Sequence, residues 1–173
     1  MSVRYYTATT MDGFIADSDN SLDWLLQHGD GSGDFYERFL SGIGAVVMGS
    51  TTYQWVLDND PGPWPYAMPS FVFTSRGLPA VEGGDIRFVH GSVADRFAEV
   101  VEAAGGRDVW VVGGGDLAGQ FHDAGHLDEV ILAVAPVALG AGAPVLPRRI
   151  TDGLTLTSAT VDGPFAMLHY RVG

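Results

Sequence analysis

The stretch that decides the fold is Asp108-Val109-Trp110-Val111-Val112-Gly113-Gly114-Gly115-Asp116-Leu117-Ala118-Gly119-Gln120-Phe121. Its first five residues are dominated by valine and tryptophan, which is typical of a buried strand, and three glycines then end the strand. Leu117, Ala118 and Phe121 follow at the spacing of one helical face. Glycines in such a turn let the backbone approach a ligand, and the free N–H groups of a helix start attract anions. The stretch therefore predicts a site for a phosphorylated cofactor, with a tight turn that binds nothing as the alternative.

A second turn of the same kind follows Ala45-Val46-Val47-Met48, a continuous apolar run typical of a strand covered on both faces. Gly49 ends this strand, and Ser50-Thr51-Thr52 are expected to cap a helix that continues through Leu57. The repetition strengthens the nucleotide hypothesis. We expect the two turns to open side by side at one edge of the sheet, where they would hold one ligand together.

Composition bounds the possible classes of function. The chain has 173 residues, of which 46% are hydrophobic, so residues 1–173 are expected to form a single domain. The 9 basic and 21 acidic residues give a formal charge of -12, which disfavours binding to nucleic acid or to an anionic membrane. The absence of cysteine excludes disulfides and thiolate chemistry. Because no apolar run has the length of a membrane span or signal region, we expect a soluble, cytoplasmic protein.

The rest of the chain predicts strands that alternate with helices. Strands are expected at residues 3–10, 70–74, 86–89 and 130–137, and helices at residues 34–41 and 92–104. Residues 14–17 and 138–144 are expected in loops, and the proline-rich residues 61–69 in an ordered loop that could line a pocket. Alternating polar and apolar residues over 154–161 and 165–172 predict a terminal antiparallel hairpin. The fold class is therefore α/β, with a mixed, mostly parallel sheet and a C-terminal antiparallel hairpin.

The spacing Gly113-x-Gly115-x-x-Ala118 also matches the glycine fingerprint of Rossmann dinucleotide-binding proteins. That fingerprint follows the first strand and is paired with an acidic residue at the end of the next one. Here it lies two thirds of the way along the chain, and the next expected strand has no acid at its end. Its position therefore argues against a Rossmann dehydrogenase.

Six motifs occur in a fixed order along the chain: Thr10-Met11-Asp12-Gly13-Phe14-Ile15-Ala16, Val47-Met48-Gly49-Ser50-Thr51-Thr52-Tyr53, Phe73-Thr74-Ser75-Arg76, Val111-Val112-Gly113-Gly114-Gly115-Asp116-Leu117, Leu127-Asp128-Glu129-Val130 and Ala135-Pro136-Val137-Ala138-Leu139-Gly140-Ala141-Gly142-Ala143-Pro144. Their order resembles the dihydrofolate reductase-like superfamily, and more closely the C-terminal reductase domain of riboflavin biosynthesis and its stand-alone relatives. The last motif is similar to the riboflavin-type reductases and not to true dihydrofolate reductases. The resemblance implies a three-layer α/β/α fold.

The resemblance also implies which residues hold an NADPH cofactor. Backbone groups near Ala8 and Ile15 would hold the nicotinamide carboxamide. The phosphates would meet the helix start formed by Gly49, Ser50, Thr51 and Thr52. The adenosine and its 2′-phosphate would lie along Thr74, Ser75 and Arg76, and the pyrophosphate side would be wrapped by Gly113, Gly114, Gly115, Asp116 and Leu117. Because the family often has Arg where this chain has Ser50, the preference for NADPH over the alternative NADH rests mostly on Arg76.

Two carboxylates are candidates for the proton source that reduction of a C=N or C=O group requires. Asp34 resembles the family's pteridine-binding acid, with Glu37 one turn further on, while Asp12 belongs to the Asp-Gly element beside the nicotinamide. A helix cap is an equal alternative for Asp34, as is an ordinary turn for Asp12, and water could supply the proton instead. Trp24, Trp64 and Tyr66 could stack on a planar heterocycle, or simply pack.

The sequence predicts an NADPH-dependent reductase of a small heterocycle, such as a pterin or a ribosylated aminopyrimidine. The alternative is a nucleotide-binding sensor or partner protein that has lost catalysis. No metal is expected, because Gly125 is predicted to end the helix between His122 and His126. Resemblance to the riboflavin-type branch implies a homodimer.

Overall fold

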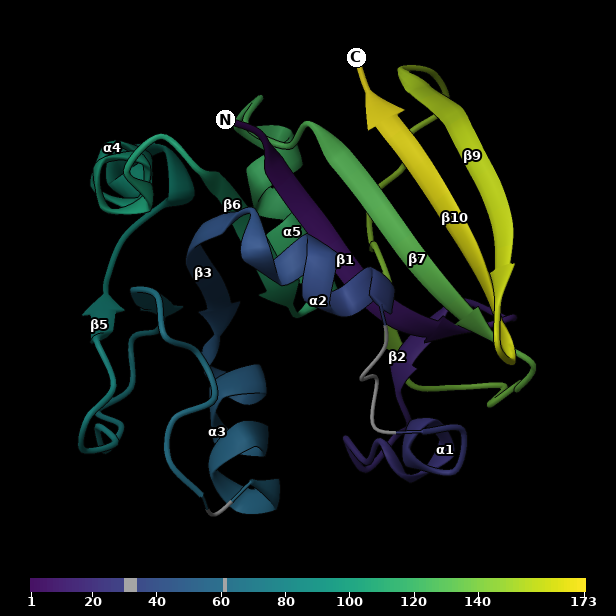
Figure 1. Cartoon of the computed structure of the whole chain (residues 1–173), viewed down its shortest axis with the longest axis horizontal. Helices are drawn as coiled ribbons and strands as arrows, with labels where there is room; N and C mark the ends of the chain where they lie inside the picture. Colours follow the sequence, from purple (N-terminus) through teal and green to yellow (C-terminus); the bar gives the residue numbers. More distant parts are fainter. Residues whose placement is uncertain (30–33, 61) are drawn as a thin grey trace.

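The computed structural model describes residues 1–29, 34–60 and 62–173. Its centre is an eight-stranded sheet with the strand order β5-β4-β3-β6-β1-β7-β10-β9 (Figure 1). The sheet strands are β1 (Val3–Thr10), β3 (Ile43–Gly49), β4 (Ser70–Phe73), β5 (Ile86–Val89), β6 (Asp108–Gly113), β7 (Glu129–Ala135), β9 (Leu154–Asp162) and β10 (Phe165–Val172). The helices are α1 (Asp23–Leu26), α2 (Asp34–Ser41), α3 (Ser50–Asn59), α4 (Val93–Ala104) and α5 (Gly115–Asp123). The sequence Gly29-Asp30-Gly31-Ser32-Gly33 predicts a flexible joint, but all of it except Gly29 lies outside the described residues, as does Pro61.

The strand directions confirm the predicted mixed sheet. Strand β1 runs parallel to both β6 and β7, and β3 runs parallel to both β6 and β4. Strands β9 and β10 form the predicted antiparallel hairpin, which joins the sheet through antiparallel pairing of β10 with β7. The parallel strands carry the continuous apolar runs because helices cover both of their faces.

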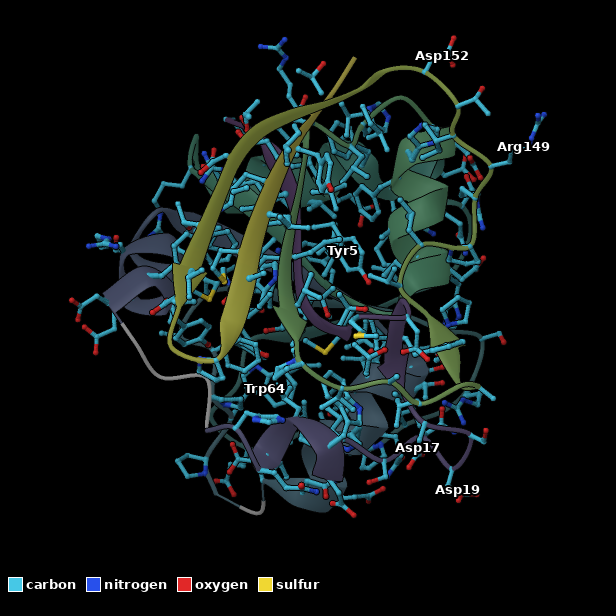
Figure 2. All side chains as sticks on the ribbon, turned by 90° about the vertical axis from the view of Figure 1, so that its right-hand side faces the viewer. Tyr5, Asp17, Asp19, Trp64, Arg149 and Asp152 are labelled. Atoms are coloured by element: carbon cyan, nitrogen blue, oxygen red, sulfur yellow. The ribbon has the colours of Figure 1, made fainter. Side chains whose placement is uncertain are left out.

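Helices lie on both faces of the sheet, so the predicted three-layer arrangement is confirmed (Figure 1). Tyr5, Val47 and Val111 point to the face covered by α4 and α5. Alternate residues, among them Val46 and Trp110, point to the face covered by α2 and α3. Figure 2 shows Tyr5 in the layer between the sheet and α5, and its hydroxyl donates to the Val145 carbonyl at 2.8 Å.

A second, two-stranded sheet was not predicted. It pairs β2 (Phe14–Ala16) with β8 (Ala143–Pro144), both within segments expected as loops. Strands of three and two residues are too short to show a hydrophobic period, and their pairing depends on tertiary contacts such as the Val145 N–H donating to the Gly13 carbonyl at 2.9 Å.

Two helix starts differ in their capping. Ser92 caps α4 through a reciprocal capping box with Asp95, a pair of residues at the spacing that favours a helix start. The residue that caps α3 is Gly49, with no side-chain hydrogen bond, so the predicted capping by Ser50-Thr51-Thr52 is wrong. These residues form the first turn itself, because the helix begins at Ser50 directly after the strand. Among the described residues, no helix has both the length and the apolar character to cross a bilayer.

Replacing Gly44 by alanine tests the packing of β3 against the end of α4. A Cβ at Gly44 would collide with the carbonyl oxygen of Ala104 and lie 2.9 Å from Cβ of Arg107. We expect Gly44→Ala to lower the free energy of unfolding by about 1–3 kcal/mol in a urea titration, because the obstacle is backbone. Gly42→Ala is the matched control, since its Cβ would make an ordinary 3.5 Å contact with the Phe39 carbonyl. Equal stability of the two variants would contradict this packing.

Candidate functional site

The two glycine turns lie side by side, as predicted. They meet at the carboxyl ends of the neighbouring strands β3 and β6. Parallel pairing of β3 with β6 places Met48 opposite Gly113. A Cβ at Gly49 would stand 3.9 Å from both the Gly113 carbonyl oxygen and the Gly114 nitrogen, so the two turns are neighbours in space. The peptide bond between Gly113 and Gly114 is cis.

Each turn opens a helix whose first amides have no side-chain cap. The residue before α3 is Gly49 and the residue before α5 is Gly114, and neither helix start has a side-chain cap hydrogen bond. The first N–H groups of a helix have no partner within the helix, and they carry the positive end of its dipole. The carboxyl ends of β3 and β6 therefore present two sets of backbone N–H donors to an anion.

A cavity of about 410 Å³ opens at these strand ends, and most of its lining is apolar. It brings together Ile15, Thr51, Thr52, Asp116 and the glycines of the second turn. The full lining consists of Thr7, Ile15, Ala16, Asn20, Leu22, Thr51, Thr52, Trp55, Val56, Tyr66, Val112, Gly113, Gly114, Gly115, Asp116, Ala143, Pro144 and Pro147. Glycine is required at position 115 because the backbone of Pro144 and Val145 comes close to the start of α5. A Cβ at Gly115 would collide with the carbonyl oxygens of these two residues.

A second hollow of about 490 Å³ adjoins the cavity along α3. The two share four lining residues, Asn20, Leu22, Thr51 and Trp55. Arg76 lines the far part of this hollow together with Asp19, Asp23 and Asp58. The two hollows together form one groove, whose lining is mostly apolar beside the glycine turns and includes charged side chains where Arg76 lies.

The remaining predicted cofactor residues do not line either hollow. Ala8 lies within β1, and Leu117 lies on the buried face of α5. Thr74 accepts a hydrogen bond from the Arg76 amide at 2.9 Å and so shapes the loop that carries Arg76. Outside both linings are Ala8, Gly49, Ser50, Thr74, Ser75 and Leu117.

The carboxylate of Asp116 is paired before any ligand arrives. It accepts hydrogen bonds from Gln120 Nε2 at 2.8 Å and from Arg148 Nη1 at 3.0 Å. These two contacts, the bond from Gln120 first, lower the pKa of Asp116. Arg148 thus offsets the negative charge that Asp116 brings to the start of α5.

Asp12 lies in an exposed turn and joins two loops that are far apart in the sequence. Its carboxylate accepts hydrogen bonds from the Leu139 amide at 3.0 Å and the Gly140 amide at 2.7 Å, and from the Thr10 hydroxyl at 2.5 Å. These bonds, that from Thr10 first, lower the pKa of Asp12. A carboxylate held ionised in this way has no proton to donate at neutral pH, so the geometry favours the turn alternative over the catalytic one.

Asp34 is the exposed first residue of α2, and it lines neither hollow. Glu37 is also exposed. Of the three aromatic residues proposed for stacking, Tyr66 lines the cavity, whereas Trp24 is buried and Trp64 packs against Tyr53 at a ring distance of 5.4 Å.

Several lining residues were not predicted. Trp55 could have been found, because it lies one helical turn after Thr51 and Thr52 on the same side of α3. Asn20, Pro144 and Pro147 had no comparable signal, since they reach the cavity from loops and from the two-residue strand β8, whose courses depend on distant contacts.

The sheet order and the two glycine turns define a dihydrofolate reductase-like fold. The dihydrofolate reductase of Enterococcus faecalis, solved in a complex with NADP(H), aligns with 99% of this chain and 96% of its own length at a TM-score of 0.65 and 16% identity, which shows the fold alone. A candidate riboflavin biosynthesis protein from Shewanella sp. PV-4 aligns with 100% of this chain and 99% of its own length, at a TM-score of 0.84 and 25% identity.

The family follows from the sequence comparisons. The model of the RibD C-terminal domain matches residues 1–167, and the chain belongs to this family. The uncharacterized protein YwjB of Bacillus subtilis (strain 168) is 32% identical over 169 residues, which span 95% of this chain and 94% of that protein. The resemblance inferred from the six motifs is therefore confirmed, and both fold and family are reductase-like.

The role of Asp12 as a structural clamp can be tested through pH. The bound carboxylate stabilises the folded protein above the ordinary Asp pKa of 3.8, and this contribution disappears as the pH falls through the lower folded pKa. We expect Asp12→Asn to have a lower Tm than the wild type at pH 7, and the difference to shrink as the pH falls below 3.8. Circular dichroism melts between pH 7 and pH 3 measure this. A difference that is independent of pH would contradict the clamp.

Proposed function

We propose that this protein is a nicotinamide-dependent reductase of a small heterocycle, of the pterin or ribosylaminopyrimidine type. The observation that carries the proposal is the meeting of two uncapped helix starts, those of α3 and α5, beside one cavity. Free backbone amides fit the phosphates of a dinucleotide, and the apolar lining fits a planar ring. Membership of the RibD C-terminal domain family supports the same conclusion.

A nicotinamide dinucleotide would occupy both hollows of the groove. The nicotinamide would lie in the apolar cavity near Ile15 and Gly114, with the phosphates at the amides of Thr51 and Thr52. When bound, the reduced coenzyme supplies the hydride. The chain's own residues orient the ring and keep water from the apolar cavity.

NADPH is the proposed coenzyme because Arg76 lines the charged end of the groove. A guanidinium is the side chain best suited to a 2′-phosphate, because it offers paired donors and a fixed charge. Asp19, Asp23 and Asp58 line the same hollow and would repel that phosphate, so Arg76 carries the preference over NADH.

A nucleotide-binding protein without turnover is the second candidate. It is favoured by one observation, namely that neither Asp34 nor Asp12 lines the cavity. The two functions differ in one measurable property, which is whether bound NADPH is consumed when a heterocycle is added.

The coenzyme proposal is tested by titrating the protein with NADPH and NADH and following coenzyme fluorescence. We expect Arg76→Gln to weaken NADPH binding roughly tenfold or more and to leave NADH binding nearly unchanged, because one charge-assisted contact is lost. Arg149→Gln makes the same charge change at an exposed residue that points away from the groove (Figure 2), and it is the control. If neither coenzyme binds the wild type, the reductase proposal fails.

The proposal extends to assembly as a homodimer through the edge strand β9. Leu154, Leu156 and Val161 expose 39%, 52% and 82% of their surface, and no residue from 154 to 161 is charged. An exposed edge strand that carries no charge before its last residue, Asp162, is prone to pair with another chain, and in a protein of charge -12 this strand also limits repulsion between copies.

Sedimentation velocity tests the assembly. We expect a wild-type dimer and a monomeric Leu156→Lys variant, because a lysine on an edge strand opposes pairing. Leu26→Lys places the same charge on another exposed leucine, in α1, and is expected to remain dimeric. A monomeric wild type would contradict the dimer and leave the coenzyme proposal untouched.

A further inference from the structure

The cavity contains few groups that can exchange a proton. Among the residues that line it, only Tyr66 and Asp116 carry an ionisable side chain. Reduction of a C=N or C=O bond needs one proton for each hydride, and a side chain in contact with the substrate delivers that proton faster than a disordered water. The proton source for a substrate in this cavity is therefore either one of these two residues or solvent.

Asp116 is poorly suited to this task. Its carboxylate is ionised and already accepts bonds from Gln120 and Arg148. Arg148 also binds Asp123 at 2.7 Å, which holds the guanidinium over α5 and keeps Asp116 charged. A carboxylate in this state accepts hydrogen bonds and has no proton to give.

Tyr66 is held in place by the proline-rich loop on either side of it. Trp64 Nε1 donates to Ser70 Oγ at 2.9 Å, and Met68 is buried, so both flanks of Tyr66 are anchored. The Tyr66 ring packs edge-on against Trp110 at 5.7 Å and against Trp64 at 5.4 Å. These contacts fix the ring at the cavity wall, where its hydroxyl carries a proton at neutral pH.

We propose that the Tyr66 hydroxyl binds the reducible group of the heterocycle and donates the proton that completes its reduction. This role rests on the proposed function. Hydride addition at the carbon turns the π pair of the C=N or C=O bond into a lone pair on nitrogen or oxygen. That lone pair takes the phenol proton, the O–H bond of Tyr66 breaks, and the nicotinamide is the species oxidised. Water then restores the phenol.

The surroundings of Tyr66 keep the phenol protonated between turnovers. Burial raises its pKa above the usual range, and the nearby Tyr36 and Asp60 add to the effect. Burial likewise raises the pKa of Tyr36, so that this phenol is also neutral. Tyr66 therefore enters each turnover as a neutral phenol.

Tyr66→Phe tests the role directly, because it removes the hydroxyl and keeps the ring. NADPH oxidation is followed with dihydrofolate and with an aminouracil that carries a phosphoribosylamino group. We expect kcat to fall about 10²- to 10⁴-fold while the Kd for NADPH changes less than about twofold. Tyr170→Phe, which removes a phenol hydroxyl from β10 outside both hollows, is the matched control and is expected to keep wild-type turnover.

A measurement without turnover accompanies the kinetics. In protein labelled with ¹³C at the tyrosine Cζ atoms, the Tyr66 resonance is identified by its loss in Tyr66→Phe. Adding NADP+ with either heterocycle is expected to shift that resonance, because the hydroxyl gains a partner, and to leave the Tyr170 resonance in place. A shift without a kcat loss in Tyr66→Phe would assign Tyr66 to binding alone and overturn its role as proton donor.

These measurements distinguish a failure of the role proposed for Tyr66 from a failure of the reductase proposal. Wild-type kcat in Tyr66→Phe, in a protein that binds and oxidises NADPH, overturns the role of Tyr66 and leaves the reductase proposal standing. If the wild type oxidises NADPH with neither heterocycle, the result counts against both the reductase proposal and the role of Tyr66. A Tyr66→Phe variant that no longer binds NADPH would show that the residue supports the fold of the groove, and it would equally overturn the proposed role.

Discussion

The parallel pairing of β3 with β6 is the constraint on which the rest of the site depends. It is this pairing that brings two turns, separated by more than sixty residues in the chain, to the same edge of the sheet. Each strand is buried on both faces, so a shift of one residue would exchange the residues beneath α4 and α5 with those beneath α2 and α3. The register that buries the apolar runs is thus the register that aligns Gly49 with Gly113 and Gly114.

For the proposed coenzyme, backbone groups at the two helix starts would offset the unfavourable net charge of the chain. A chain of formal charge -12 does not favour a ligand with several phosphates, and three carboxylates line the same hollow as Arg76. The amides at the starts of α3 and α5 do not titrate, and they require no additional cationic side chain. Of these two helices, only α5 has an acid in its first turn, and that residue, Asp116, pairs with Arg148.

Elements with a strong local pattern were predicted well, and those fixed by distant contacts were not. Strand β1 and strand β5 have the predicted bounds, because their apolar residues and flanking turns are sufficient to define them. The β2–β8 pair lacks such a pattern. The glycine turns and Thr51, Thr52 and Ile15 could be placed from motifs, whereas the bonds of Asp12 to residues 127 and 128 positions away could not. For the same reason the sequence could not distinguish a catalytic Asp12 from a structural one.

The residues that line the cavity come from regions of the chain that are synthesised at very different times. Ile15 and Ala16 leave the ribosome early, α3 and Tyr66 follow, and Ala143, Pro144 and Pro147 come from the last fifth of the chain. The central strand β1 likewise obtains its neighbours β6 and β7 only after residue 107. The proposed coenzyme would therefore have no complete site on a nascent chain, and the long-range contacts must form before any ligand of this cavity can contribute to stability. For a protein that binds the proposed coenzyme, a shortage of it would then affect the lifetime of finished molecules and leave their initial maturation unchanged.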